Sequence, residues 1–479
     1  VDTSWIIDGQ GQHQRGTCLR ARARRVRVTP AEQAGSGRTN LSFFDTLWVA
    51  APPVQLVFLY ELPTADECFP SVVRRLKESL AAALALYLPL AGRLVYVAET
   101  RDVVLDWSHS DAVGVAFTEA EGDMDVRRLA GDEAHDVPAF RSLVAGAGRP
   151  GAPGARAATR LGGGMALGVS VHHAATDGHG LWRFVDAWVS ASRRQGSSVT
   201  KKSLGSPCYG REAIVHPRGD ELARELLHKL APNLPVARAT DYDTRRFELA
   251  RRTFYLSAQD VRSLTRLINS LASAEAEAGS GEAPPPVSTF VALSALGWTA
   301  FVRSKDLAAG EDTHLIFLAD LRARLNPPVG RRLPGQLPQR VRGERGRRRP
   351  LGRAGPPARG AGDPGGGAGD GGGASGRDGD RVRRPPPSRR ANVASSPHHR
   401  VHDATDFGFG KPARVELVSM NHDGEMALFG GRRDGEVQLS VSLDPGRMDA
   451  FKAHVLAACR GGGVTAGKPW AGLTRRPRL

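Results

Sequence analysis

This sequence is poor in cysteine and in long apolar runs, and both shortages narrow the class of protein. Four cysteines, Cys18, Cys68, Cys208 and Cys459, are spread over 479 residues without a CxxC pair. This spacing argues against a zinc site or a disulfide framework and favours a reducing, cytoplasmic compartment. No run of about 18 apolar residues occurs, so we expect no transmembrane helix. Residues 1–25 lack the apolar stretch of a secretory signal, and we expect a disordered N-terminal extension there.

The positive charge is present but concentrated in one segment. The formal net charge is +16, which raises the question of a nucleic-acid partner. Residues 331–400 hold seventeen of the arginines against five acidic residues. The rest of the chain is only mildly basic, so no folded basic groove is indicated and we expect no nucleic-acid partner.

The length is enough for two to three domains or one large two-lobed enzyme. Apolar periodicity predicts helices at 69–87, 181–188, 221–230, 258–271, 288–302 and 448–458. Apolar runs predict strands at 54–60, 95–97, 103–107, 165–171, 252–256 and 314–319.

Three further patterns concern turns and linkers. The strands expected at 413–420, 425–430 and 436–443 are divided by glycine-containing turns, which predicts a meander. Residues 141–160 are rich in Gly, Pro, Ala and Arg, which predicts a loop. AEAEAGSGEAPPP at 274–286 predicts a flexible linker.

The turn that follows the strand at 165–171 carries the strongest chemical signal. His172, His173, Asp177 and Gly178 form an HHxxxDG pattern between that strand and the helix at 181–188. A histidine held at a strand end with a near-neutral pKa suits general-base work on a hydroxyl. A capped turn with a surface histidine is the alternative, and the spacing of the motif favours the catalytic interpretation.

A second motif, DFGFG, begins at Asp406 and includes Gly408 and Gly410. The acid suggests a metal site or the DFG of a kinase, but the sequence has no kinase Gly-rich loop with its strand lysine and no HRD loop. Glycines that alternate with aromatic residues predict a tight, packed turn. We therefore expect a structural role and no metal ligand.

HHAATDG together with DFGFG resembles the plant BAHD family of acyltransferases. LSFFDTLW, LPLAGRL, STFVALSALGW and ADLRARLNPPV match the family further, over about 26–330 and 391–457. LSFFD, LWRFVDAW and His216-Pro217 are similar to the branch that acylates flavonoid and phenolic glycosides, often with malonyl-CoA.

The resemblance implies an α/β, chloramphenicol-acetyltransferase-like fold of two lobes, each a mixed β-sheet with flanking helices. On this basis residues 26–200 form the N-terminal lobe and 201–220 a crossover. Residues 221–457 form the C-terminal lobe, interrupted at 331–390, and 458–479 form a disordered tail. The family binds no permanent cofactor and uses acyl-CoA as co-substrate. The resemblance also implies a monomer whose partners are acyl-CoA and a phenolic glycoside, with no membrane partner.

The resemblance also implies roles for individual residues. His173 would be the base that takes a proton from the acceptor hydroxyl, and Asp177 would shape the turn through a salt bridge to Arg322 or Arg324. Gly178 would permit the turn, and His172 would be structural. Asp406, Gly408 and Gly410 would be structural and distant from the acceptor.

Three residues are weaker candidates for substrate binding. Ser288 and Thr289 resemble positions along the CoA channel. Arg183 is the nearest cation after the motif that a malonyl carboxylate could meet, whereas malonyl-selective relatives carry theirs at a site like Leu181.

Residues 331–390 depart from the family, since Gly and Arg each make up about a quarter of them. Leu333–Leu337 reads Leu-Pro-Gly-Gln-Leu, which the nucleotides CTACCTGGGCAACTGC encode. Read one base later, the same nucleotides encode Tyr-Leu-Gly-Asn-Cys. This stretch is typical of the branch at this place. We therefore hypothesise two compensating frame errors near 330 and 390. This predicts a second lobe that lacks at least a strand and a helix.

Three alternatives remain open from the sequence. The chain could be a hydroxycinnamoyl-type or other acyl-CoA transferase with an alcohol or amine acceptor. It could be an inactive relative or a defective gene product. A nucleic-acid binder that uses the Arg/Gly segment is the third.

Overall fold

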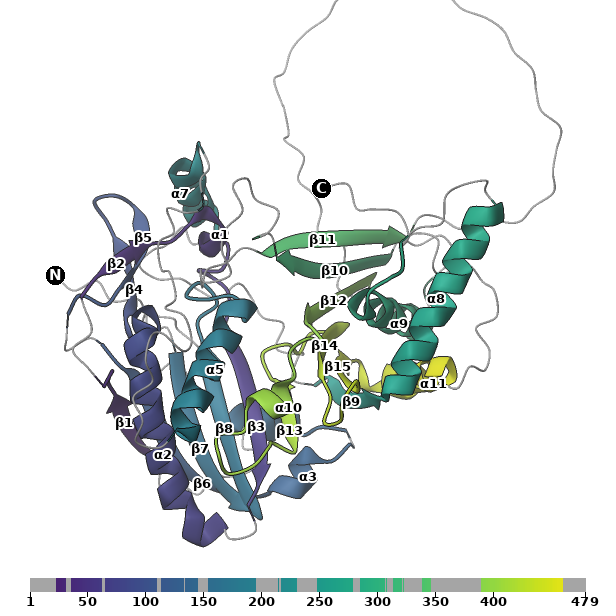
Figure 1. The fold of residues 1–479 in the computed structure, drawn as a ribbon. Coiled ribbons are helices and arrows are strands. Elements are labelled where there is room, and N and C mark those ends of the chain that lie inside the picture. The colour runs from purple at the N-terminus through teal and green to yellow at the C-terminus, as the bar shows by residue number, and fades with distance from the viewer. Residues whose placement is uncertain are drawn as a thin grey trace, which may run out of the picture.

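The computed structural model describes residues 23–31, 36–62, 65–109, 113–132, 134–144, 154–194, 214, 217–230, 248–278, 285–305, 307, 313–320, 322, 338–345 and 389–459. Two six-stranded sheets with flanking helices and one small three-stranded sheet organise these residues (Figure 1). Each large sheet is mixed, so the described part of the chain has the two α/β lobes that were predicted.

The first large sheet has the order β1-β6-β7-β8-β3-β13. Its strands are β1 (Arg24–Val28), β6 (Val115–Asp125), β7 (Gly154–Gly162), β8 (Gly164–Val171), β3 (Val54–Glu61) and β13 (Arg414–Leu417). Side chains alternate between its faces: Leu56 and Phe58 join one core cluster, and Val57 and Leu59 join another.

Helices cover both faces of this sheet. The larger cluster packs under α2 (Ala65–Leu86) and α5 (Gly178–Arg193), and the smaller one under α3 (Val126–Ala130) and α4 (Val137–Ser142). The sheet is therefore the centre of a sandwich, and β8 runs through its buried middle before it delivers the HHAATDG turn.

The second large sheet has the order β11-β10-β12-β14-β15-β9. Its strands are β11 (Pro338–Arg345), β10 (Thr313–Asp320), β12 (Arg390–Ser395), β14 (Glu425–Gly430), β15 (Val437–Leu443) and β9 (Ala250–Leu256). The helices α8 (Ala258–Ala278), α9 (Thr289–Ser304) and α11 (Pro445–Cys459) build a core with this sheet.

The remaining elements lie around the first lobe. The small sheet contains β2 (Arg38–Asn40), β5 (Asp102–Asp106) and β4 (Arg93–Val97). The short elements are α1 (Phe43–Thr46), the 3-10 helix η1 (Leu88–Ala91) and α10 (Val401–Ala404), and α7 (Gly219–Leu230) packs against α1 and β5. In the described part of the chain, no helix has both the length and the apolar character to cross a membrane.

The predicted meander at 413–443 was wrong. β14 and β15 form a hairpin in the second sheet, but β13 pairs antiparallel with β3 and completes the edge of the first sheet. Pairing with the open edge of β3 places Glu416 against Arg251 and Thr253 of the second lobe, while Arg414 donates to the Ala130 carbonyl oxygen of the first lobe and to Glu416. Periodicity reveals a strand but not which edge it joins.

Lobe boundaries also differ from the expected ones. Helix α7 was assigned to the C-terminal lobe from residue 221, yet it packs on α1, and Leu227 belongs to the first lobe's core. Val401, Phe407 and Val415 belong to that core as well. Long connections thus return late parts of the chain to the first lobe.

Four local expectations need correction. The loop predicted at 141–160 contains the start of β7, whose small side chains such as Ala155 and Ala158 are buried. The linker predicted from 274 contains the last turn of α8, since Ala and Glu favour a helix up to Ala278. Strand β1 begins at Arg24, inside the predicted disordered extension, and α11 ends at Cys459, inside the predicted tail.

The Gly/Arg segment contributes a strand. β11 pairs antiparallel with β10 over all eight of its residues. The segment that was expected to deprive the second lobe of at least a strand and a helix therefore supplies one strand at 338–345, where backbone pairing does not depend on side-chain type. Residues 346–388 and 460–479, and most of the predicted crossover at 201–220, lie outside the described residues.

Candidate active site

The HHAATDG turn begins with a buried histidine that supports the backbone. The Nδ1 atom of His172 accepts a hydrogen bond from the Ala174 N–H at 3.2 Å. Burial lowers the pKa of His172 to about 4, and the neighbouring His173 reinforces this effect. The ring is therefore neutral near pH 7, and its contact fits the structural role expected for it.

His173 is only half-buried at the tip of this turn. Burial lowers its pKa to about 4, partly opposed by a hydrogen bond from the ring to the residue's own backbone. Only Nδ1 can reach the residue's own carbonyl oxygen, so this bond assigns the proton of the neutral ring to Nδ1. Nε2 is then the nitrogen that can accept a proton, and its pKa of about 4 lies below the near-neutral value expected from the sequence because the ring is buried.

Asp177 fixes the turn from its other end. Its Oδ1 accepts a hydrogen bond from the Gly180 N–H at 2.9 Å and caps α5. Its Oδ2 lies 2.8 Å from Nη2 of Arg322, whose side chain is 2% exposed. Burial raises the pKa of Asp177, and the Arg322 charge and the Gly180 N–H oppose that rise.

Arg322 connects the second lobe to the turn. It follows β10, and its Nη1 contacts Oδ1 of Asp320 at 2.9 Å. The ion pair expected between Asp177 and an arginine of the other lobe is thus formed by Arg322. Arg324, the alternative partner, lies outside the described residues.

The structure gives no steric reason for glycine at position 178. The residue does not have a positive φ, and a Cβ there would meet open space. Gly178 is the first residue of α5, a position that other residues also occupy. The expectation that Gly178 permits the turn was therefore wrong on backbone grounds.

The weaker candidates lie on two helices. Ser288 caps α9, and its Oγ accepts a hydrogen bond from the Val291 N–H at 3.3 Å; Thr289 is the first residue of that helix. Arg183, on α5, hydrogen-bonds with the side chain of Tyr87. This contact directs Arg183 toward the end of α2.

DFGFG forms a tight turn at the opposite end of α5. Asp406 Oδ1 accepts hydrogen bonds from the N–H groups of Gly408 and Gly410, at 2.9 and 3.1 Å. Both glycines have a positive φ, 96° and 110°, which a side chain would strain. The motif therefore needs these residue types for its backbone.

Contacts of DFGFG place it far from His173. The Ser192 Oγ donates to the Phe407 carbonyl oxygen at 2.7 Å, and the Phe407 ring packs on Trp188. Ser192 is fifteen residues after Asp177 along α5, a rise of roughly 22 Å. The two motifs together indicate the family in the sequence, but in the structure they lie at opposite ends of α5.

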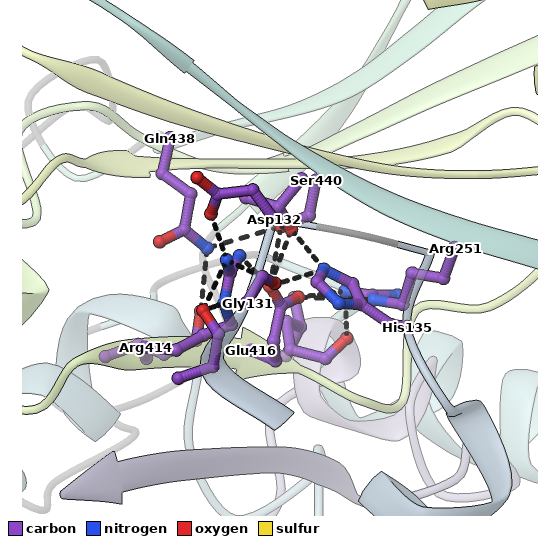
Figure 2. Close-up of polar contacts among 12 residues, drawn as sticks. Gly131, Asp132, His135, Arg251, Arg414, Glu416, Gln438 and Ser440 are labelled. Atoms are coloured by element: carbon purple, nitrogen blue, oxygen red, sulfur yellow. Dashed lines mark hydrogen bonds and ion pairs between the residues drawn. The ribbon is translucent and has the colours of Figure 1, made fainter. Parts of the chain in front are cut away.

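A buried polar network joins β13 of the first sheet to β9 of the second, and the sequence did not reveal it (Figure 2). Glu416 on β13 accepts hydrogen bonds from Arg251 at 3.0 Å and Thr253 at 2.7 Å, both on β9. His135 Nε2 lies 3.5 Å from Glu416, and Arg414 reaches both Glu416 and Asp132. Burial by itself would raise the pKa of Glu416, but Arg251, His135 and Arg414 hold it well below its usual value.

A cavity of about 710 Å³ lies between the small sheet and α7. Its lining includes Arg38, Asn40, Ser42, Asp220 and Arg224. Such side chains can hydrogen-bond a hydroxylated ligand. Among the described residues, no group of three or more His, Cys, Asp or Glu side chains is arranged to hold a metal ion.

One residue beside the turn was not singled out as a site residue. The indole ring of Trp48 stacks on His173, with ring centroids 3.9 Å apart and planes 19° apart. The sequence signal was present, because LSFFDTLW was recognised as a motif, but its last residue carried no assigned role.

Known proteins share this sequence and fold. Residues 22–344 match the Transferase family. A malonyl-CoA:anthocyanidin 5-O-glucoside-6''-O-malonyltransferase of Arabidopsis thaliana is 27% identical over 457 residues, 89% of this chain and 95% of that protein. A phenolic glucoside malonyltransferase 1 of Bemisia tabaci is 29% identical over 310 residues, 63% of this chain and 66% of that protein.

A solved structure gives the same fold. Vinorine synthase superposes with a TM-score of 0.61 at 17% identity and covers 91% of this chain and 97% of its own. The family match spans more than half of the chain, includes the HHAATDG turn and fits the two mixed sheets described above. The chain therefore belongs to the Transferase family, the BAHD family that its two motifs indicate, and it is an acyltransferase.

Proposed function

We propose that this protein transfers an acyl group from acyl-CoA to a hydroxyl of a phenolic or flavonoid glycoside, with His173 as general base. The observation that carries the proposal is the tip of the HHAATDG turn. There the neutral, half-buried imidazole of His173 lies at the end of β8, and Arg322 of the other lobe braces the same turn. The relatives named above act on anthocyanidin and phenolic glucosides, which supports this acceptor class.

The reaction follows from the basic Nε2. His173 Nε2 takes the hydroxyl proton while the oxygen attacks the thioester carbonyl carbon, and a C–O bond forms. The tetrahedral intermediate collapses, the C–S bond breaks, and the CoA thiolate takes the proton from His173. The imidazole returns to its neutral state, and no acyl-enzyme forms.

The other candidates have supporting roles in this proposal. Asp177 and Arg322 keep the turn in shape, and Asp406, Gly408 and Gly410 stabilise the far end of α5. Ser288 and Thr289 lie at the N-terminus of a sixteen-residue helix, where backbone N–H groups favour the phosphates of CoA.

The test is transfer of a defined acyl group by the full chain and by His173→Ala. Malonyl-CoA and phenolic glucosides are incubated with each protein, and the products are analysed by mass spectrometry. We expect an acylated glucoside, and a loss of roughly 10²- to 10⁴-fold in His173→Ala. Gly178→Ala is the matched control, since its side chain meets open space. Near-full activity in His173→Ala would contradict the mechanism.

A hydroxycinnamoyl-type donor is the second candidate, and one contact favours it. A malonyl carboxylate needs a cation, and Arg183, the candidate for that task, is engaged with Tyr87. A coumaroyl group has no such carboxylate. Competition between malonyl-CoA and coumaroyl-CoA for one glucoside decides between the donors by the mass of the product.

An inactive product is the third possibility, because the segment 331–390 departs from the family. We propose that restoring the frame raises the activity above that of the chain as it stands. The two chains differ only between about 330 and 390, so a parallel assay isolates the segment. Resequencing of the transcript must reveal the Tyr-Leu-Gly-Asn-Cys frame, and its absence would refute the frame hypothesis.

We further propose a cytosolic monomer. Cys68 and Cys459 are free thiols in the structure, which suits a reducing compartment. Size-exclusion chromatography with light scattering measures the mass, and a value near 51 kDa is expected. A mass twice as large would contradict the monomer.

A further inference from the structure

We propose that Trp48 is a positioning residue for His173: its indole face holds the imidazole plane so that Nε2 is directed at the acceptor hydroxyl. The proposal rests on the general-base role proposed above and deepens it. It starts from the stacked rings, whose centroids are 3.9 Å apart and whose planes are 19° apart. The two carboxylate oxygens of Asp177 bind Gly180 and Arg322, so Asp177 acts on the shape of the turn.

The sheet register explains why these two rings meet. Val54, the first residue of β3, pairs with Val171, the last residue of β8. The strands are antiparallel, so the chain that enters β3 lies beside the chain that leaves β8. Trp48 stands six residues before Val54, and His173 stands two residues after Val171.

The turn that carries Trp48 is held firmly. Ser42 and Asp45 form a capping box at the start of α1, in which the Asp45 carboxylate accepts from the Ser42 N–H at 2.9 Å. The Trp48 N–H then donates to the Asp45 carbonyl oxygen at 3.0 Å, and the Ala51 N–H donates to the Trp48 carbonyl oxygen at 3.0 Å. These hydrogen bonds hold the backbone of Trp48 in place, and Pro52-Pro53 restricts the backbone between Trp48 and β3.

Two contacts together orient the imidazole. The ring's hydrogen bond to its own backbone restrains rotation at one edge, and the indole restrains the face. Displacement of a reacting group by about 1 Å can reduce a rate by about 10²-fold. A flat aromatic surface that fixes the ring therefore acts on the chemical step.

The stack also favours the state that forms during the reaction. When His173 takes the hydroxyl proton, the ring becomes an imidazolium that lies against the indole face. A cation within about 6 Å of a tryptophan ring centroid is attracted by its π-electrons, and the attraction grows when water is excluded. Trp48 should therefore affect turnover more than substrate binding.

The experiment compares Trp48→Leu and Trp48→Phe in the full chain, with Leu47→Ala as control. Leu47 is the adjacent residue, and its side chain is 46% exposed. We expect Trp48→Leu to lower kcat by about 10- to 100-fold while KM for acyl-CoA changes by less than about twofold. Phenylalanine retains an aromatic face and should recover most of kcat, and the control should leave both constants unchanged.

A spectroscopic measurement separates orientation from general damage. In ¹⁵N-histidine-labelled protein, the ring nitrogens of His173, assigned by their loss in His173→Gln, report the tautomer. We expect Nδ1–H in the unchanged chain and in Trp48→Phe, and averaging between tautomers in Trp48→Leu at an equal melting temperature. Should Trp48→Leu not fold, the Phe variant decides, because a folded Trp48→Phe with averaged tautomers would refute the role.

The outcomes distinguish this inference from the proposed function. If His173→Ala is inactive while Trp48→Leu keeps kcat and the Nδ1–H tautomer, the general base stands and the positioning role is overturned. If His173→Ala retains activity, the proposed function fails. The ring-nitrogen signals then still decide whether Trp48 orients the imidazole.

Discussion

The two polar junctions between the lobes differ in how many polar groups they contain and in how deeply their carboxylates are buried. The turn junction consists of Asp177, Arg322 and Asp320 beside His173, and only one of its two carboxylates is buried. The strand junction consists of Glu416, Arg251, Arg414, Thr253 and His135, with Glu416 1% exposed at its centre (Figure 2).

Their electrostatics differ in the same way. Burial dominates at Asp177 and raises its pKa, whereas two arginines and a histidine outweigh burial at Glu416 and hold its pKa well below the usual range. The strand junction therefore stabilises the arrangement of the lobes, while the turn junction shapes a loop that does chemistry. Substitutions at the two junctions should separate these tasks.

The largest expected effect is on stability at the strand junction. Glu416→Ala leaves Arg251 and Arg414 buried without their central carboxylate, and such a change costs about 3–5 kcal/mol. Urea denaturation measures the free energy of unfolding. Glu99→Ala, at an exposed turn, is the control, and an equal loss of unfolding free energy in both variants would contradict the central role of Glu416.

Acid should act on His172 in the turn before it acts on Glu416 in the strand junction, and His135 of that junction, whose pKa burial also lowers, should lose stability in the same pH window as His172. The folded-state pKa of His172 is about 4 and its ordinary value is 6.5, so the unfolded chain binds more protons in this window. The contribution of His172 to the free energy of unfolding is fully present above pH 6.5. It falls by on the order of 3 kcal/mol as the pH approaches 4. The stability from Glu416 is present above its ordinary pKa of 4.5 and is lost only as the pH falls through its lower folded value.

His172→Asn tests that assignment. The Asn side chain can accept the Ala174 N–H through its oxygen but does not titrate. Unfolding free energies measured from pH 7 to pH 4 should decline less steeply in this variant. An unchanged slope would show that another group causes the acid loss.

Asp177→Ala should have a moderate effect on stability and a clear effect on turnover. Loss of the helix cap costs about 1 kcal/mol, and the loss of the ion pair to Arg322 adds to it. Asp177→Asn keeps the cap and loses the charge, so its stability should lie between that of Asp177→Ala and the unchanged chain. Thermal melting and kcat are measured for all three chains, and identical kcat values would remove the turn junction from the mechanism.

The smallest expected effect has the opposite sign. Arg156 on β7 is 1% exposed, and burial lowers its pKa to about 9. It lies over Phe184 and Trp188, its Nη1 donates to the carbonyl oxygens of Ala155 and Ser170 at 2.9 and 2.8 Å, its buried Nε has no hydrogen-bond partner, and it has no ion pair among the described residues. Arg156→Met should therefore raise the free energy of unfolding by about 1 kcal/mol. Arg251→Met is the contrast, since it strips Glu416 of a partner and should destabilise strongly.

Local patterns predicted most elements because their periodicity is a property of neighbouring residues. The helix expected at 69–87 is α2, and the strand expected at 314–319 is β10, with ends displaced by a few residues. The strand at 154–162 was missed because its Ala-rich, two-sided burial has no alternation. The extra turn of α8 was missed because Gly and Pro further on suggested a linker.

The sequence by itself determined the family, the HHAATDG base candidate and the tight DFGFG turn, since each depends on residue types at fixed short spacing. Only the tertiary structure decided that β13 completes the first sheet, that Arg322 meets Asp177 and that Trp48 covers His173. These contacts join residues 125 to 361 positions apart. Strand pairing in the first sheet places β13 beside β3 and the chain of Trp48 beside that of His173, whereas packing between the lobes places Arg322 beside Asp177. Register depends on which strand edges are free to pair and which sheet faces must be buried, and the sequence of a single segment determines neither.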